Sequence, residues 1–417
     1  MPPDGTTTPR QPLGSGYWRL WASSGLSNLA DGIVKVALPL VAIQFTRSPT
    51  LIAGVTFAVT LPWLLFALPA GALADRLDRR RAMVGANCVR ALLLAVLGCA
   101  VVVDVGSIWV LYVVALGVGV AETIYDTSAQ SILPQVVRSD ELSRANGRLY
   151  AAELTANQFV GPPLAGFLVA TGAAVAFAAP VALWAVAVVA LLFVRGSFRI
   201  ERARRASLRA DIAEGLRFLW RHRLLRTFAV MTGVVNAATS ATGAIFVLYA
   251  IGPTSPMGLS QQAYGVLLAA VAVGSLVGSF VAEPVTRMLG RARTLALTVA
   301  TAALMVGVPA VTTNPFVIGA VYFVAGLGLV IWNVIVVSLR QSVTPNRLLG
   351  RVNSGYRLVA WGAMPLGAAI GGVLAQLLGL RAVFVTMALL TLTLFAAMTI
   401  VTDDRMAEAE RDRSHDN

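Results

Sequence analysis

Long apolar runs separated by short polar connections dominate the chain. Runs of about 20 apolar residues are long enough to cross a bilayer as α-helices. About twelve such runs follow one another, in rough outline at 18–45, 50–74, 82–104, 107–130, 146–171, 174–195, 225–251, 262–286, 294–313, 316–340, 353–378 and 381–402. Apolar positions come in runs rather than alternating, which argues against the strands of a membrane barrel. The pattern predicts an all-α membrane protein of about twelve transmembrane helices.

The composition favours the same class of protein. The 417 residues are 57% hydrophobic and only 13% charged, whereas soluble domains carry about 25% charged residues. Helices satisfy every backbone polar group internally, as a lipid environment requires. A large buried core in a soluble all-α protein is the much weaker alternative.

The arginines predict an orientation. They gather in alternate connections, and the intervening connections carry only Arg47 and Arg381. Because basic loops stay inside, both termini are expected to be cytoplasmic in a multi-pass protein of a bacterial cytoplasmic (inner) membrane. The net charge of +13 is therefore interpreted as a topology signal, and nucleic acid is not expected as a partner.

The chain divides into two similar halves around a basic segment, 195–226. Gln130-Ser-Ile-Leu-Pro134 precedes Leu142-Ser-Arg144-Ala-Asn146, and Gln341-Ser-Val-Thr-Pro345 precedes Leu349-Gly-Arg351-Val-Asn353. A repeated six-span unit is typical of secondary transporters. The predicted organisation is two pseudo-symmetric six-helix bundles, with an N-terminal tail at 1–17, bundles at 18–195 and 225–402, a basic cytoplasmic linker at 196–224 and a C-terminal tail at 403–417.

The linker contains an amphipathic stretch. We expect it to lie on the inner membrane surface, with Phe218, Leu219 and Trp220 at the interface. A site for a regulatory partner is the alternative interpretation.

A charged connection between the second and third apolar runs carries a recognisable motif. Gly71-Ala-Leu-Ala-Asp75-Arg76-Leu-Asp78-Arg79-Arg80-Arg81 resembles the loop signature of the major facilitator superfamily, with Asp78 where glycine is usual. Gly161-Pro162-x-x-Ala165-Gly166 is similar to the antiporter signature of the fifth span. The resemblance covers residues 17–402 and implies the major facilitator fold.

Shorter motifs suggest a branch of that superfamily. Asn28-Leu-Ala-Asp31-Gly32, Ala121-Glu122 and Arg144-Ala-Asn146 resemble drug/proton antiporters that include the enterobactin exporter and macrolide efflux proteins. The resemblance implies a monomeric secondary transporter that uses a proton gradient, without a cofactor, to move a small molecule across the bilayer. No nucleophile–base set, phosphate-binding glycine loop or metal-spaced cluster is found in the sequence, so neither an enzyme nor a metal site is expected.

Charged residues within the apolar runs are candidate functional groups, since a charge near the bilayer centre costs at least about 2.5–3.5 kcal/mol. Asp31 is the first candidate for proton or substrate binding. Lys35, one turn away, is a possible structural partner for it. Glu122 is a candidate for binding a cation or a proton, or for a buried structural hydrogen bond. The two histidines lie outside the runs, so carboxylates would have to carry any proton coupling.

The loop motif is expected to act as a conformational latch, with Asp126 accepting hydrogen bonds from its arginines. The latch candidates are Gly71, Asp75, Arg76, Asp78, Arg79, Arg80 and Asp126. Arg90 and Glu153 are assigned to a polar network on the cytoplasmic side, and Arg357 is expected to snorkel.

Uncharged polar and aromatic residues are candidates for lining a central cavity, because such groups suit an amphipathic organic molecule. They are Asn28, Asn236, Thr239, Ser240, Trp332 and Asn333. Ordinary helix packing is the alternative role.

These observations predict proton-coupled export of a small amphipathic molecule, such as a drug, siderophore or secondary metabolite, by alternating access. An importer or a flippase for a lipid-like substrate on the same fold remains the nearest alternative. A membrane scaffold or sensor that does not transport is the alternative from another class.

Overall fold

The computed structural model describes residues 13–76, 78–138, 141–194, 196, 198, 208–345 and 348–415. Within this part, eleven helices are long and apolar enough to cross a membrane. The N-terminal bundle contains α1 (Ser15–Phe45), α2 (Pro49–Arg76), α3 (Arg79–Val102), α4 (Ile108–Val136), α5 (Leu142–Leu154), η2 (Thr155–Val160), α6 (Gly161–Thr171) and α7 (Ala173–Leu192).

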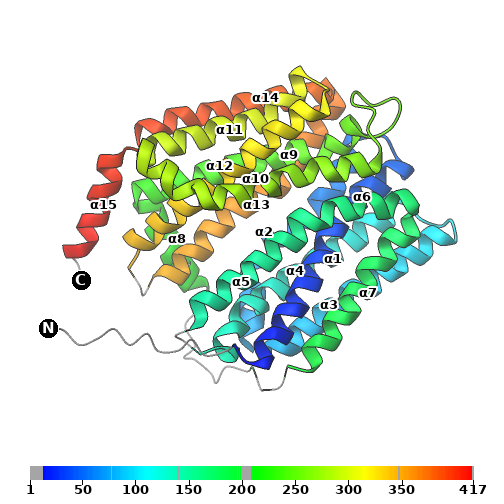
Figure 1. Cartoon of the computed structure of the whole chain (residues 1–417), viewed down its shortest axis with the longest axis horizontal. Helices are drawn as coiled ribbons and strands as arrows, with labels where there is room; N and C mark the ends of the chain where they lie inside the picture. Colours follow the sequence, from blue (N-terminus) through cyan, green and yellow to red (C-terminus); the bar gives the residue numbers. More distant parts are fainter. Residues whose placement is uncertain are drawn as a thin grey trace.

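The C-terminal bundle follows a short helix, α8 (Leu208–Arg221). It contains α9 (Arg223–Ala250), α10 (Gln261–Leu289), α11 (Arg291–Val311), α12 (Pro315–Val343), α13 (Leu349–Leu378), α14 (Leu380–Leu392) and η3 (Thr393–Thr399), and α15 (Asp403–His415) ends the described chain. The predicted all-α membrane fold of two six-helix bundles is confirmed, and Figure 1 shows how the two bundles lie beside each other.

The fifth span explains why eleven rather than twelve long helices are counted. The expected continuous span at 146–171 is instead α5, a π-helical turn η2 and α6. Single π-helical turns inside α-helices occur frequently at functional sites. This turn lies directly before Gly161-Pro162.

The two bundles pack together at one end of the molecule and separate at the other. One hydrophobic core contains residues of both bundles, among them Ile43 of α1 and Tyr249 of α9. At the other end each bundle has its own core, one around Tyr17 and Tyr125 and the other around Phe228. The separate cores lie at the end where α1 starts and where α8 and α15 are found (Figure 1).

The most extensive contacts between the bundles are those of α2 with α13 and of α6 with α10. Near the shared core, Ser48 Oγ donates a hydrogen bond to Gln376 Oε1 at 3.1 Å, and Thr50 donates to the Gly372 carbonyl at 3.2 Å. In the α6–α10 contact, a Cβ on Gly166 would lie 2.3 Å from the Gln261 carbonyl oxygen. Only glycine allows the two backbones to approach this closely.

The linker helix α8 docks on the C-terminal bundle. Leu219 is fully buried in the core around Phe228, and the Glu214 carboxylate pairs with Arg351 of α13. The expectation that Leu219 lies at the membrane interface is therefore wrong, because its side chain belongs to the protein core. Trp220, which is 46% exposed, keeps a position compatible with an interface.

Candidate functional site in the N-terminal bundle

A buried ion pair connects α1 with α3. The Asp31 Oδ1 and Arg90 Nη1 atoms are 2.6 Å apart, and the side chains are 4% and 0% exposed. Arg90 from the neighbouring helix, and not the alternative partner Lys35, thus forms the ion pair with Asp31. The assignment of Arg90 to a polar network on the cytoplasmic side is wrong, because its guanidinium pairs with Asp31.

The surroundings of Arg90 suit a cation. Its Nη2 atom donates to Ser27 Oγ at 3.0 Å and also to Asn87 Oδ1. The ring centroids of Tyr125 and Trp184 lie 4.7 and 5.1 Å from its Cζ atom. Because the desolvation of a buried ion pair is offset only by good geometry and additional hydrogen bonds, these contacts make the Asp31–Arg90 pair a fixed, dry unit.

A second ion pair lies one turn along α1 and is open on one side. Lys35 Nζ lies 3.1 Å from Glu122 Oε1 of α4, and the lysine side chain is 44% exposed whereas that of Glu122 is 8% exposed. Lys35 Nζ also donates to Asn157 Oδ1 at 3.5 Å, and Asn157 Nδ2 donates to Asn28 Oδ1 at 3.5 Å. Asn28 therefore belongs to the same polar cluster as Lys35 and Glu122.

The π-helical turn positions Asn157 in this cluster. A Cβ on Gly32 of α1 would lie 2.4 Å from the Asn157 carbonyl oxygen, and a Cβ on Gly161 would lie 2.8 Å from the Gly32 backbone. The contact between α1 and η2 is thus a direct contact between backbones. In the antiporter-like motif, Gly161 packs against α1 and Gly166 packs against α10.

A cavity of about 290 Å³ lies beside Lys35, between the two bundles. The polar residues of its lining all belong to the N-terminal bundle, whereas α10 contributes only apolar residues. The lining residues are Gly32, Lys35, Val36, Asn157, Gln158, Pro162, Leu268, Val271 and Ala272. The cavity therefore joins the open ion pair to the interface between the halves.

Further charges surround this region. Asp126 interacts electrostatically with Lys35, as does Glu153. Arg357 of α13 interacts with both of these carboxylates. Arg357 therefore brings a positive charge of the C-terminal bundle toward carboxylates of the N-terminal bundle. Glu153 is one of these carboxylates.

The described part of the loop motif contacts backbone groups instead of Asp126. The Arg79 guanidinium donates to the Ser131 carbonyl, and Arg80 donates to the Val194 carbonyl at 2.7 Å. Asp78 caps α3, accepting from the Arg81 backbone N–H at 3.0 Å. The side chains of three latch candidates, Gly71, Asp75 and Arg76, lie outside the described residues.

Four of the cavity candidates in the C-terminal bundle make hydrogen bonds within that bundle. Asn236 donates to the Ala360 carbonyl at 2.8 Å, Trp332 donates to Thr232 at 3.2 Å, and Asn333 donates to the Leu329 carbonyl at 3.1 Å. Thr239 donates to Val235 of its own helix at 2.9 Å. The Ser240 hydroxyl is buried with no hydrogen-bond partner in the described structure.

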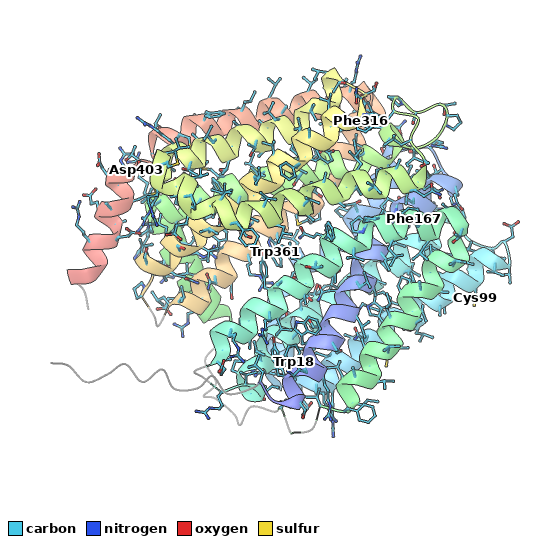
Figure 2. All side chains as sticks on the ribbon, in the orientation of Figure 1. Trp18, Cys99, Phe167, Phe316, Trp361 and Asp403 are labelled. Atoms are coloured by element: carbon cyan, nitrogen blue, oxygen red, sulfur yellow. The ribbon has the colours of Figure 1, made fainter. Side chains whose placement is uncertain are left out.

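Sequence reasoning missed an aromatic contact between the bundles. The rings of Trp63 on α2 and Trp361 on α13 meet with centroids 4.7 Å apart at an interplanar angle of 86°. In Figure 2, Trp361 lies between the two bundles. A tryptophan within an apolar run gives no signal in the sequence that it has a partner in the other half.

Comparison with protein families decides the classification. The model of the transmembrane secretion effector family matches residues 7–417. This chain belongs to that family of major facilitator transporters. As a transmembrane secretion effector protein it is a multi-pass membrane transporter and not an enzyme.

Among its relatives, this transmembrane secretion effector protein is similar to the multidrug efflux pump Tap of Mycolicibacterium fortuitum, with 29% identity over 86% of this chain and 89% of that protein. It is also 29% identical to Tap of Mycobacterium tuberculosis, over 86% and 87% of the two chains.

Solved structures with the same fold include the nucleoside transporter NupG, with a TM-score of 0.73 at 14% identity over 93% of this chain and 99% of that chain. A bacterial homologue of the iron transporter ferroportin in an inward-facing state superposes with a TM-score of 0.72 at 16% identity, over 93% and 99% of the two chains. At these identities the likeness concerns the fold alone.

Proposed function

We propose that this protein exports small amphipathic organic molecules in exchange for protons, by alternating access. The observation that carries the proposal is that α1 forms two ion pairs. The Asp31–Arg90 pair is buried, and the Lys35–Glu122 pair is open to the cavity between the bundles. Charges inside a membrane span are costly and therefore mark transport pathways. The similarity to Tap multidrug efflux pumps supports export of drug-like molecules.

The orientation inferred from the arginines assigns the separated end of the bundles to the cytoplasm. Substrate would then enter from the cytoplasm and reach Lys35, Asn157 and the apolar wall of α10. Rocking of the two bundles about this midplane region would open the other side.

Coupling requires that protons and substrate favour different states of the two bundles. Lys35 and Glu122 attract each other while Glu122 is charged. Protonation of Glu122 would weaken that attraction and release Lys35, because the ion pair depends on both charges. Asp31 would contribute a second proton-accepting carboxylate, held by Arg90.

This proposal is tested by measuring the flux of a self-quenching cationic dye in vesicles that contain the purified protein, under an imposed pH gradient. Gradient-driven dye flux is expected in the wild type, with at least a tenfold loss in Glu122→Gln and in Asp31→Asn. Glu283→Gln is the matched control, because Glu283 is a carboxylate that is 80% exposed in a surface pair with Arg287. Unchanged gradient-driven flux in both variants would refute the proposed coupling.

A further inference from the structure

The contact between Trp63 and Trp361 contains a third member, the Arg357 guanidinium. Its Cζ atom lies 4.2 Å from the Trp361 ring centroid and 5.6 Å from that of Trp63. Arg357 precedes Trp361 by one turn of α13, so the helix itself directs the guanidinium to the ring. A cation within about 6 Å of a tryptophan face is attracted by the ring quadrupole.

This arrangement provides the groups that recognise an organic cation. Trp63, Trp361 and Arg357 are all only partly buried. The charges that interact with Arg357 include Asp126 and Glu153 of the N-terminal bundle and Arg340 of its own bundle. Two aromatic rings with carboxylates nearby bind a large, weakly hydrated cation better than they bind a neutral or anionic molecule.

We propose that the Trp63–Trp361 pair is a subsite for the positive group of an amphipathic organic cation, and that Arg357 occupies it as an internal substitute until the substrate arrives. The inference rests on the proposed export function and assigns it a substrate class. When the substrate cation binds, Arg357 leaves the rings and moves toward Asp126 and Glu153. The exchange keeps a positive charge on the rings in both conditions.

The position of the subsite links binding to conformation. Trp63 belongs to the N-terminal bundle and Trp361 to the C-terminal bundle, so the subsite is complete only in conformations that bring α2 and α13 together at this level. A substrate that binds both rings therefore favours those conformations over the others.

Binding of tetraphenylphosphonium to the purified full-length protein in detergent tests this inference by titration calorimetry. Trp361→Leu and Trp63→Leu are each expected to weaken binding about tenfold, and Trp361→Phe less, because a phenyl face is a weaker cation site. Arg357→Gln is expected to tighten binding severalfold, since it removes the internal competitor. Triphenylphosphine oxide, a neutral analogue, is expected to bind more weakly and to be insensitive to Arg357→Gln.

The matched control is another tryptophan–arginine contact. Arg148 lies 5.4 Å from the Trp18 ring centroid, within the N-terminal bundle, so Trp18→Phe and Arg148→Gln should leave phosphonium affinity within twofold of the wild type. Should a leucine variant aggregate, Trp361→Phe and Arg357→Gln still decide the question.

The inference is wrong if both leucine variants bind phosphonium like the wild type, if Arg357→Gln weakens binding, or if the neutral analogue binds equally well. Because this titration needs no gradient, its failure is distinguishable from failure of proton coupling. If gradient-driven flux is observed but the subsite does not distinguish the cation from its neutral analogue, only the proposed substrate class is wrong.

Discussion

At the scale of residues, the two ion pairs of α1 differ in their surroundings more than in their chemistry. Asp31 and Arg90 are both sealed from solvent, whereas Lys35 faces the cavity. The sealed pair holds α1 and α3 together, and the open pair is directly accessible to substrate.

Removing one partner of the sealed pair should destabilise the protein strongly. Arg90→Gln leaves the Asp31 carboxylate buried without its cation, and the expected loss is about 3–5 kcal/mol of unfolding free energy. Denaturation of the purified protein in sodium dodecyl sulfate measures the loss. The Asp31→Asn/Arg90→Gln double variant should recover part of it, because no unpaired charge remains buried.

The exposed pair of Arg287 and Glu283, whose atoms are 2.5 Å apart at the surface, is the control. Arg287→Gln should change the unfolding free energy by less than about 1 kcal/mol. Equal effects of Arg90→Gln and Arg287→Gln would contradict a special role for the sealed pair.

At the scale of elements, Asp78 shows how local structure explains a departure from the family motif. Its carboxylate accepts from the Arg81 backbone N–H and from the Phe198 backbone N–H, both at 3.0 Å. Asp78 therefore caps α3 and ties it to the chain after α7. Asp78→Ala should cost about 0.5–2 kcal/mol from loss of the cap.

Hydrogen exchange measures the effect of Asp78→Ala directly, since the amides of Arg81 and Phe198 should exchange faster. Asp78→Asn should retain the protection of only one of the two amides, because Oδ1 and Oδ2 each accept from one amide and asparagine keeps a single side-chain oxygen. Unchanged exchange at both amides in Asp78→Ala would contradict the capping role.

The contact between α1 and η2 gives a second prediction at this scale. Gly32→Ala places a Cβ 2.4 Å from the Asn157 carbonyl oxygen, and such overpacking costs about 1–3 kcal/mol. Gly25→Ala on the same helix meets no atom within 4 Å and should be neutral or stabilising. Thermal unfolding in detergent compares the two variants, and equal melting temperatures would contradict the tight contact.

The sequence predicted the helices better than it predicted which side chains pair between helices. Run length and arginine placement are local properties, so spans and repeats could be found without a structure. The pairing of Asp31 with Arg90 and of Trp63 with Trp361 depends on which helix faces which, and spacing along one helix does not contain that information. The π-helical turn was missed for a similar reason, since residues 155–160 contain no glycine or proline that would mark a change in the helix.

At the scale of the whole molecule, the bundles share a core at one end and have separate cores at the other. Alternating access requires the shared end to separate during each cycle. A covalent link at that end should therefore stop transport, while leaving the structure described here undisturbed. Ser48, directly before α2, and Gln376 of α13 are suited to such a link because their side chains meet at 3.1 Å.

In a background where Cys88 and Cys99, both exposed, are replaced by serine, Ser48→Cys/Gln376→Cys should react readily with a short, disulfide-containing bismaleimide. Dye export from vesicles should fall at least tenfold after cross-linking and return when the linker's disulfide is reduced. Each single-cysteine variant receives the same treatment and should retain its flux. The chemical cross-link joins only the start of α2 to α13. Full export by the cross-linked protein would therefore mean that this end does not open during transport, and the rocking mechanism would be wrong.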